Sequence, residues 1–216
     1  MDGSNELIEK KCMIDILIET YQLYFKHGAR SPKKVDCFHG KIKEILEKII
    51  SKSKDKNVLS VKLEYKVNSC NSSSKKRCDI VVFKNEKPYI IFPIKLIMTN
   101  YKQNKNNSWE NLTGELCHIK WCNDDINIIP INILMNKTPY LNVKKIITKF
   151  ENVTIQDIKI YNILKEKKLC YDIINYIIDV EHINKVGEKF STIPTLTNFN
   201  KNTEYICFEQ ILKDLI

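Results

Sequence analysis

Two continuous apolar runs joined by a short polar turn constrain the fold of this chain more than any other feature. The first runs from Cys78 to Phe83 and the second from Tyr89 to Ile97. Both are rich in Ile and Val, which is typical of β-strands covered on both faces. The turn from Asn85 to Lys87 is short enough for a hairpin. We therefore expect two antiparallel strands in a sheet that has helices on both sides.

Each apolar run contains one charged residue. Asp79 lies at the start of the first run, and Lys95 interrupts the second. A buried charge is costly unless it is paired, so both residues need an explanation. One explanation is a mutual ion pair, or side chains that reach solvent at the strand ends. The other is a functional site in which both take part.

The chain before these runs is predicted to form two helices and a strand. The first helix spans about residues 5–26 and stops at Gly28, and the second starts at Ser31 and Pro32. Residues 58–67 alternate between apolar and polar and predict a half-buried strand. Its apolar face would carry four residues: Val61, Leu63, Tyr65 and Val67.

The chain after these runs is predicted to be mostly helical. Residues 98–107 are rich in Asn, Gln and Lys and predict a loop. Ser108 can cap a helix that runs to about Trp121, and residues 127–134 predict a buried strand. Beyond Pro139 the pattern favours three helices: one opened by a capping box of Thr154 and Asp157 and ending at Lys168, one over 171–182, and one over 205–216.

Charge and composition bear on partners and compartment. The formal net charge of +9 favours a polyanionic partner such as nucleic acid, although nearly all the basic residues are lysines. No run of about eighteen apolar residues exists, and the start lacks the pattern of a secretory signal. The eight cysteines form no Cys-x-x-Cys pair, so reduced, mostly buried thiols are expected. We expect an intracellular protein without a membrane span.

Phosphodiester hydrolysis requires the residue types found here. It uses a divalent cation to polarise the phosphate, carboxylates to hold that cation, and often a cationic side chain near the nucleophile. Mg²⁺ takes oxygen ligands and keeps several waters, so one or two carboxylates suffice, and Mn²⁺ can substitute. Asp79, Lys95 and Glu110 would supply this set as catalytic residues.

Asp79, followed by Pro93, Ile94 and Lys95 and then by an Asn-rich segment and Glu110, resembles the PD-(D/E)xK nuclease superfamily, in its type II restriction-endonuclease-like branch. The resemblance covers roughly residues 58–140. It implies an Mg²⁺-dependent endonuclease that hydrolyses double-stranded DNA, in the form of a homodimer. It also implies that Asp79 and the Ile94 backbone carbonyl bind the metal.

One position departs from the family pattern. The motif has an acidic residue two positions before the lysine, where this chain has Pro93. The helix that follows supplies the carboxylate in some members, which makes Glu110 the expected metal ligand. Glu115 is the other candidate, but five helical residues correspond to about 140° of net rotation, so both are not expected to face one metal.

Further acidic residues are possible helpers. The resemblance often includes a carboxylate from an early helix, here Glu44 or Glu47, and each could equally be a solvent-facing charge. Glu64 lies on the polar side of the first strand and could face the cleft or pair with a neighbouring lysine.

The Asn-rich segment has the composition of a nucleic-acid contact. Asn and Gln can make bidentate contacts to adenine, Lys can reach phosphates and Tyr can stack on a base. The predicted contact residues are Asn100, Tyr101, Lys102, Gln103, Asn104, Lys105 and Asn107.

The expected fold is α/β, with a restriction-endonuclease-like central mixed β-sheet of four to five strands flanked by helices and a helical C-terminal region. The chain is long enough for one domain. We divide it into N-terminal helices (1–57), a catalytic core (58–140) and a mostly helical remainder (141–216). One alternative is a catalytically inactive nucleic-acid-binding protein that keeps the nuclease fold. Another is an interaction protein in which Asp79 and Lys95 merely pair.

Overall fold

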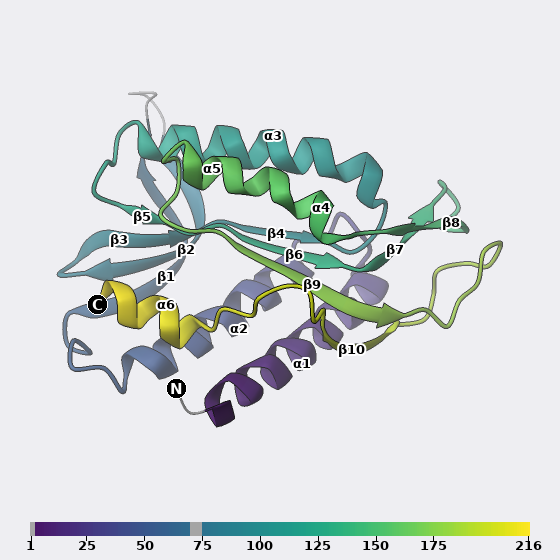
Figure 1. The fold of residues 1–216 in the computed structure, drawn as a ribbon, viewed down its shortest axis with the longest axis horizontal. Helices are drawn as coiled ribbons and strands as arrows, with labels where there is room; N and C mark the ends of the chain where they lie inside the picture. Colours follow the sequence, from purple (N-terminus) through teal and green to yellow (C-terminus); the bar gives the residue numbers. More distant parts are fainter. Residues whose placement is uncertain (1–2, 70–74) are drawn as a thin grey trace.

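The computed structural model describes residues 3–69 and 75–216, with side chains described from residue 6 onward, and has helices on both sides of mixed β-sheets (Figure 1). The helices are α1 (Gly3–His27), α2 (Lys33–Ile50), α3 (Tyr101–Lys120), α4 (Ile155–Ile158), the short 3-10 helix η1 (Lys159–Tyr161), α5 (Asn162–Glu166) and α6 (Phe208–Leu215). The strands are β1 (Leu59–Asn68), β2 (Lys75–Lys84), β3 (Lys87–Phe92), β4 (Ile94–Ile97), β5 (Asn127–Ile128), β6 (Ile131–Met135), β7 (Lys137–Leu141), β8 (Ile147–Asn152), β9 (Ile174–Glu181) and β10 (Thr195–Phe199).

The two four-stranded sheets are continuous with each other. Their strand orders are β1-β2-β3-β5 and β10-β9-β6-β4. Strand β4 follows β3 after Pro93, and β6 follows β5 after Pro130. Backbone bonds cross this junction, from Ile129 N–H to Ile91 O at 2.8 Å and from Ile131 N–H to Pro93 O at 2.8 Å. Pairing is antiparallel between β1, β2 and β3 and parallel between β3 and β5, so the expected mixed sheet is confirmed.

The predicted hairpin is also confirmed. Asn85 and Glu86 both have left-handed backbones, with φ of 50° and 64°. Two consecutive positive φ values match the twist of the strands that a two-residue hairpin turn connects. The turn sets the register of the first two pairs, Lys84 with Lys87 and Phe83 with Pro88, and a β-bulge then shifts the register by one residue.

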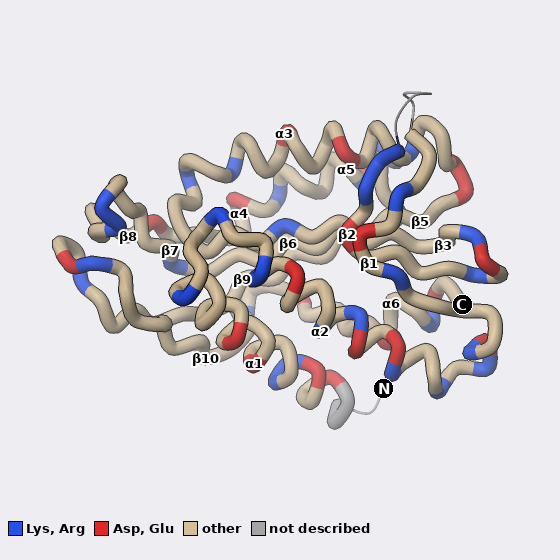
Figure 2. Tube along the Cα trace, turned by 180° about the vertical axis from the view of Figure 1, so that it is seen from behind, with Lys and Arg blue, Asp and Glu red and all other residues tan. Residues whose placement is uncertain are grey.

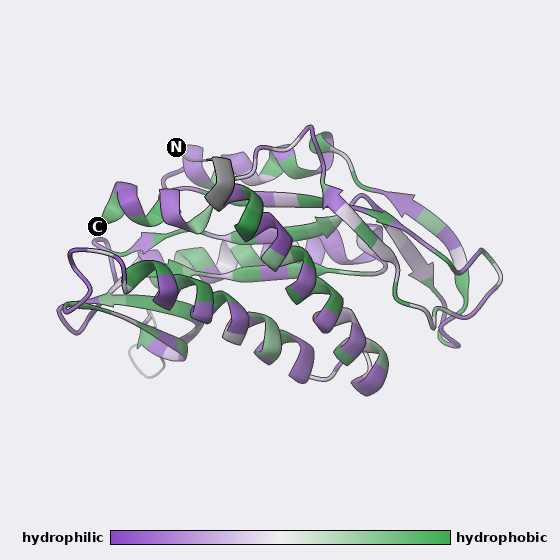
Figure 3. Cartoon of the chain, turned by 90° about the horizontal axis from the view of Figure 1, so that it is seen from below, coloured by the Kyte–Doolittle hydropathy of each residue, from purple (hydrophilic) through white to green (hydrophobic). Residues whose placement is uncertain are grey.

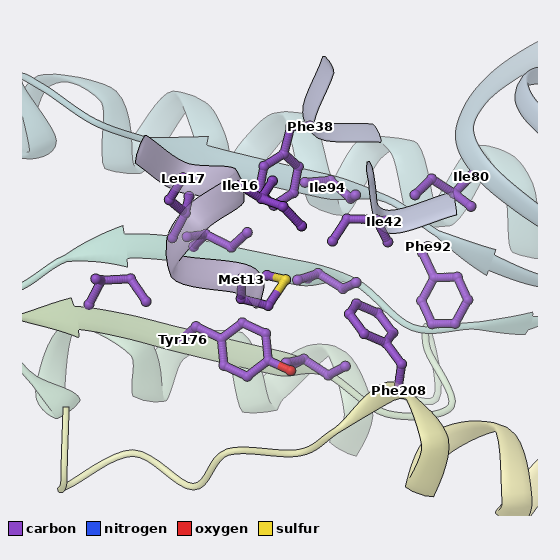
Figure 4. Packing of buried hydrophobic residues seen from close by; sticks show 14 of the residues in the cluster. Met13, Ile16, Leu17, Phe38, Ile42, Ile80, Phe92, Ile94, Tyr176 and Phe208 are labelled. Carbon is purple, nitrogen blue, oxygen red and sulfur yellow. The ribbon is translucent and has the colours of Figure 1, made fainter. Parts of the chain in front are cut away.

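Each face of the sheet has its own hydrophobic core. Ile80 and Val82 of β2 belong to the core under α1, α2 and α6, whereas Val81 and Phe83 belong to the core under α3 and the α4–α5 segment. Figure 1 shows these two helical layers on opposite sides of the strands, and Figure 4 shows the first core from close by. Burial on both faces explains why the run from Cys78 to Phe83 has almost no polar residue.

Helices α1 and α2 form as predicted. Apolar residues of α2 recur every three or four positions, and the buried ones include Phe38, Ile42 and Leu46. Both helices are hydrophobic on one side and polar on the other (Figure 3). Gly28, with φ of 84°, ends α1, and its N–H donates to Tyr24 O at 2.8 Å. A left-handed residue at this position is a common helix stop, and glycine adopts it without steric cost.

Strand β1 does not keep one apolar face, contrary to prediction. Val61 and Leu63 pack in the core under α1 and α2, but Val67 lies in the opposite core and the Tyr65 ring contacts Phe83 edge-on at 4.9 Å. Glu64 lies between the two halves with φ of 51°. Because a left-handed residue interrupts the alternation of a strand, the side chains after it exchange faces.

Helix α3 begins at Tyr101 rather than at Ser108. The predicted loop is helical because tertiary contacts hold its start. The buried Glu151 of β8 accepts the Lys102 N–H at 3.0 Å, which satisfies a free helical donor and places negative charge at the helix N-terminus. The Asn100 side chain binds the Leu141 backbone through both its oxygen and its nitrogen.

The prediction of a mostly helical region after residue 140 is wrong. Strands β7 and β8 form an antiparallel hairpin, and β9 pairs with β6 and β10. The helix expected over 171–182 is therefore the strand β9. Its apolar residues are mainly isoleucines, which favour strands, and a continuous apolar run does not distinguish a covered strand from a buried helix.

Other C-terminal predictions are confirmed in part. Thr154 and Asp157 form the expected capping box, with the Thr154 N–H donating to Asp157 Oδ2 at 2.9 Å. The helix that follows is divided into α4, η1 and α5. The final helix is present as α6.

The seven cysteines among the described residues are free, as expected, while Cys70 lies outside them. Only Cys78 and Cys170 of the seven are buried, so the expectation of mostly buried thiols is wrong. Among the described helices, none combines the length and the apolar character that crossing a membrane requires.

Glu9 of α1 provides a test of how α6 docks on this fold. Its Oε1 accepts the Phe208 N–H at 3.0 Å and the Tyr205 hydroxyl at 2.9 Å. Burial nevertheless raises the pKa of the Glu9 carboxyl above 4.5. An acid whose pKa is raised by folding loses stability as pH rises through the folded value.

We expect Glu9→Gln to be more stable than the wild type at pH 7, because the amide oxygen keeps both hydrogen bonds without a buried charge. The difference in unfolding free energy should shrink as pH falls from above the raised folded pKa toward 4.5 and should be lost below that value, where Glu9 is protonated in both states. Urea titrations at several pH values measure it. A difference in unfolding free energy that does not change with pH would contradict the raised pKa of Glu9.

Candidate metal and phosphodiester site

Asp79 lies where the pairing of β2 with β3 ends. The last pair at this end is Ile80 with Phe92, and the next residue of the second strand, Pro93, has no N–H to donate. The Asp79 carboxylate binds the following donor, because Ile94 N–H donates to Asp79 Oδ2 at 2.7 Å. This bond orients the Asp79 side chain at the junction of β3 and β4.

Glu64 lies across from Asp79 on β1. The register of β1 and β2 on both sides of this position places the two residues opposite each other. Carboxylates in directly opposed positions repel, and a left-handed backbone at a residue other than glycine costs on the order of 1 kcal/mol. Figure 2 shows acidic residues on β1 and β2 where the strands run side by side. Two unfavourable features therefore coincide at this point of the sheet.

His39 of α2 completes this group. Its side chain is only 3% exposed, and its Nδ1 lies 3.2 Å from Glu64 Oε1. Arg77 of β2 binds the other Glu64 oxygen, with Nε to Oε2 at 2.7 Å. One ligand atom from each of His39, Glu64 and Asp79 lies within 4.8 Å of the other two. The sheet edge and the helix therefore bring two carboxylates and an imidazole to one point.

The electrostatics of Asp79 agree with this geometry. Burial raises the pKa of the Asp79 carboxyl, while the Ile94 N–H and the nearby His39 and Lys95 act to lower it. A carboxylate whose charge is poorly compensated in the free protein gains most from a bound cation. Perturbed acids of this kind concentrate at functional sites.

The three donors fit a divalent cation. Carboxylate oxygens suit Mg²⁺ and Mn²⁺, and an imidazole nitrogen favours a transition metal, so this set suits Mn²⁺ better than Mg²⁺. A cation would also remove the repulsion between Glu64 and Asp79. Whether the Ile94 carbonyl joins the ligands stays a prediction.

Lys95 is held by the helix on the other side of the sheet. Its Nζ lies 2.9 Å from Glu115 Oε2, and Lys76 Nζ lies 3.5 Å from Glu115 Oε1. The Glu115 side chain is 8% exposed, so this carboxylate is compensated by two ammonium groups. Lys95 therefore pairs with Glu115. The alternative interpretation, in which Lys95 and Asp79 form an ion pair with each other, is wrong.

This geometry corrects the expectation that Glu110 is the helix carboxylate of the site. Glu110 is exposed on α3, whereas Glu115 shares the buried face of that helix with Leu112, Leu116 and Ile119. The two positions are separated by about 140° around the helix axis, so only one can face the sheet. Glu115 is the carboxylate that reaches Lys95.

Glu44 and Glu47 do not belong to the cluster. Both lie on the solvent side of α2, where they form short-range pairs with Lys41 at 3.3 Å and Lys43 at 3.1 Å. His39 is the residue of this helix that reaches the strands. The spacing of His39 from Val35 and Ile42 places it on the apolar face of α2, where it is buried. That position was the available signal.

The predicted nucleic-acid contacts divide into three groups. Four of them are held by contacts within the protein: Asn100 binds Leu141, Tyr101 is 1% exposed and cannot stack on a base, Gln103 accepts from Asn100, and Lys105 lies 3.6 Å from Asp157. Lys102 has an exposed side chain. Asn104 and Asn107 line a cleft of about 470 Å³ that His39 and Lys95 also line.

Metal binding is the direct test of the cluster. Mn²⁺ at about one hundred times its Kd should stabilise the protein by about 2.7 kcal/mol and raise Tm by roughly 5–10 °C. Glu64→Gln removes one ligand charge and should abolish most of this shift. Differential scanning fluorimetry with Mn²⁺ and with EDTA measures both. Glu47→Gln is the matched control, and an equal shift in the two variants would exclude the cluster as the metal site.

Comparison of the chain with protein families, with curated proteins and with solved structures gives no match, so the assignment of this site rests on its own geometry and on the motif residues.

Proposed function

We propose that this protein is a metal-dependent nuclease that hydrolyses phosphodiester bonds of DNA at the His39, Glu64 and Asp79 cluster. The observation that carries the proposal is the convergence of these three donors, within 4.8 Å of one another, beside the strand that bears Lys95. The order of one helix, four strands, one helix and two strands from α2 to β6 supports a restriction-endonuclease-like arrangement. The net charge of +9 supports a polyanionic substrate.

The chain's own residues have separable roles in this mechanism. A divalent cation bound here would supply Lewis-acid stabilisation of the phosphate and activate a water. Glu64 and Asp79 would hold it through their carboxylates, and His39 through its imidazole. Lys95 donates hydrogen bonds to the attacking water and to the phosphate, where negative charge builds up as the bond to the leaving oxygen breaks. Glu115 positions Lys95.

Pro93 removes the usual strand carboxylate from the family pattern, and in this proposal Glu64 supplies the missing negative charge from β1. The two carboxylates then come from neighbouring strands. An inactive nucleic-acid-binding protein is the alternative. A loss of metal binding in the Glu64→Gln variant would argue against this alternative. Double-stranded DNA as substrate and a homodimer as the active form stay predictions.

We expect the wild type to nick or cleave plasmid DNA in the presence of Mn²⁺ or Mg²⁺. Lys95→Met keeps the apolar stem and removes the ammonium, and it should lower the rate at least a hundredfold, the usual size of such a contribution. Lys87→Met, at the exposed start of β3, is the matched control. Circular dichroism establishes that both variants fold. Equal rates for the two would refute the role of Lys95.

A second pair of variants decides between the helix carboxylates. Glu115→Gln weakens the support of Lys95 and should lower cleavage at least tenfold, whereas Glu110→Gln should retain the wild-type rate. A metal ligand would lose Mn²⁺ binding, but a positioning residue keeps it, so Glu115→Gln should show the full Mn²⁺-induced rise in Tm. A lower cleavage rate in Glu110→Gln together with a wild-type rate in Glu115→Gln would show that Glu110, and not Glu115, belongs to the site.

A further inference from the structure

The cleft beside the metal cluster has two chemically different walls. It lies along β4, between the region where α1 meets α2 and the N-terminal half of α3. Its volume of about 470 Å³ is within the usual range for sites that hold small ligands. The mechanism proposed above uses only His39 and Lys95 from its lining.

One wall is a row of amide side chains. Asn104, Asn107 and Asn111 of α3 all line the cleft. Their spacing of three and four residues places them on one face of the helix. Asn104 donates through Nδ2 to Thr99 O at 3.1 Å, so its side-chain oxygen is the group that can accept a hydrogen bond from a ligand. Each amide carries both donor and acceptor groups.

The other wall is apolar. It contains Tyr24 of α1 and Val35 of α2, of which Val35 is the more exposed, while Phe38 and Met98 also line the cleft but are buried. Lys34 also borders this wall, but its ammonium donates to the carbonyl oxygens of Ala29 and Ser31. Its charge is thus used to close the turn between α1 and α2.

We propose that this cleft holds one unpaired nucleobase of the DNA strand that is cleaved, with adenine preferred. The inference rests on the proposed function, because it is the bound strand that brings the base to the cleft. A nucleobase has flat apolar faces and a polar edge. The apolar wall contacts a face, and the row of asparagines hydrogen-bonds the edge.

The preference for adenine follows from the amide groups. A side-chain amide can donate to N7 and accept from the N6 amino group of adenine, and such a pair discriminates against other bases. The base must be unpaired because its faces are stacked on neighbours in intact duplex DNA. Enzymes that act on a nucleotide in a duplex can turn it out of the stack at a cost of a few kcal/mol.

The position of the cleft links base and phosphate. His39 and Lys95 form part of its lining and also belong to the metal cluster and to the Lys95–Glu115 pair. A nucleotide whose base lies between Asn107 and Val35 therefore has its phosphate near the reacting groups. The asparagines would determine which bonds are cut.

Binding measured in EDTA separates this inference from catalysis. The probes are a fluorescein-labelled oligodeoxyadenylate and a strand of the same length with abasic sites, and fluorescence anisotropy gives both affinities. The wild type should bind the adenine strand more tightly. The double variant Asn107→Ala/Asn111→Ala should weaken binding to the adenine strand about tenfold and leave the abasic strand unchanged.

Asn106→Ala is the matched control, since Asn106 is exposed on the same helix but does not line the cleft. Equal wild-type affinity for the two strands would overturn the inference. So would equal weakening on both strands, or an effect of Asn106→Ala as large as that of the double variant. Plasmid cleavage with Mn²⁺ is scored separately: cleavage with base-independent binding rejects only the nucleobase site, and base-dependent binding without cleavage rejects only the nuclease.

Discussion

The hydrogen bond from the Ile94 N–H to the Asp79 carboxylate holds the candidate site together. Strand pairing between β2 and β3 stops at Pro93 because proline has no donor, and the next N–H would lack a strand partner. Asp79 fills that place at 2.7 Å. The same residue therefore closes the sheet and presents a carboxylate to the cluster, so a change in either strand would move the site.

The cluster is expensive for the free protein. Glu64 has a left-handed backbone and lies opposite another carboxylate. It is also the residue after which the apolar side chains of β1 pack in the opposite core. His39 is a buried polar residue on the apolar face of its helix. Backbone strain and close carboxylates of this kind persist when the surrounding structure enforces them. The two cores on either side of the sheet provide that constraint, and a bound cation would recover part of the cost.

The two sides of the sheet contribute different groups. Helix α2 brings His39 from one core, and α3 brings Glu115 and the asparagine row from the other. Lys95 lies on β4 between them. This division explains why Glu115 reaches the lysine while the metal ligands come from β1, β2 and α2, and it places the cleft along the free edge of β4 where both layers meet.

The sequence by itself determined the local elements and the two central charges. Strong apolar patterns and turn residues predicted α1, α2, the β2–β3 hairpin, the capping box of Thr154 and α6, and the cost of burying charge singled out Asp79 and Lys95. Local patterns did not determine β9, because a run of buried isoleucines is compatible with a helix or with a strand until its neighbours are known. They also could not show that Glu151 starts α3 at Tyr101, that a left-handed Glu64 turns β1 over, or that His39 and Glu115 are the helix residues that face the strands. Those outcomes depend on contacts between residues far apart in the chain, and only the tertiary structure decides which side of a helix or strand meets which partner.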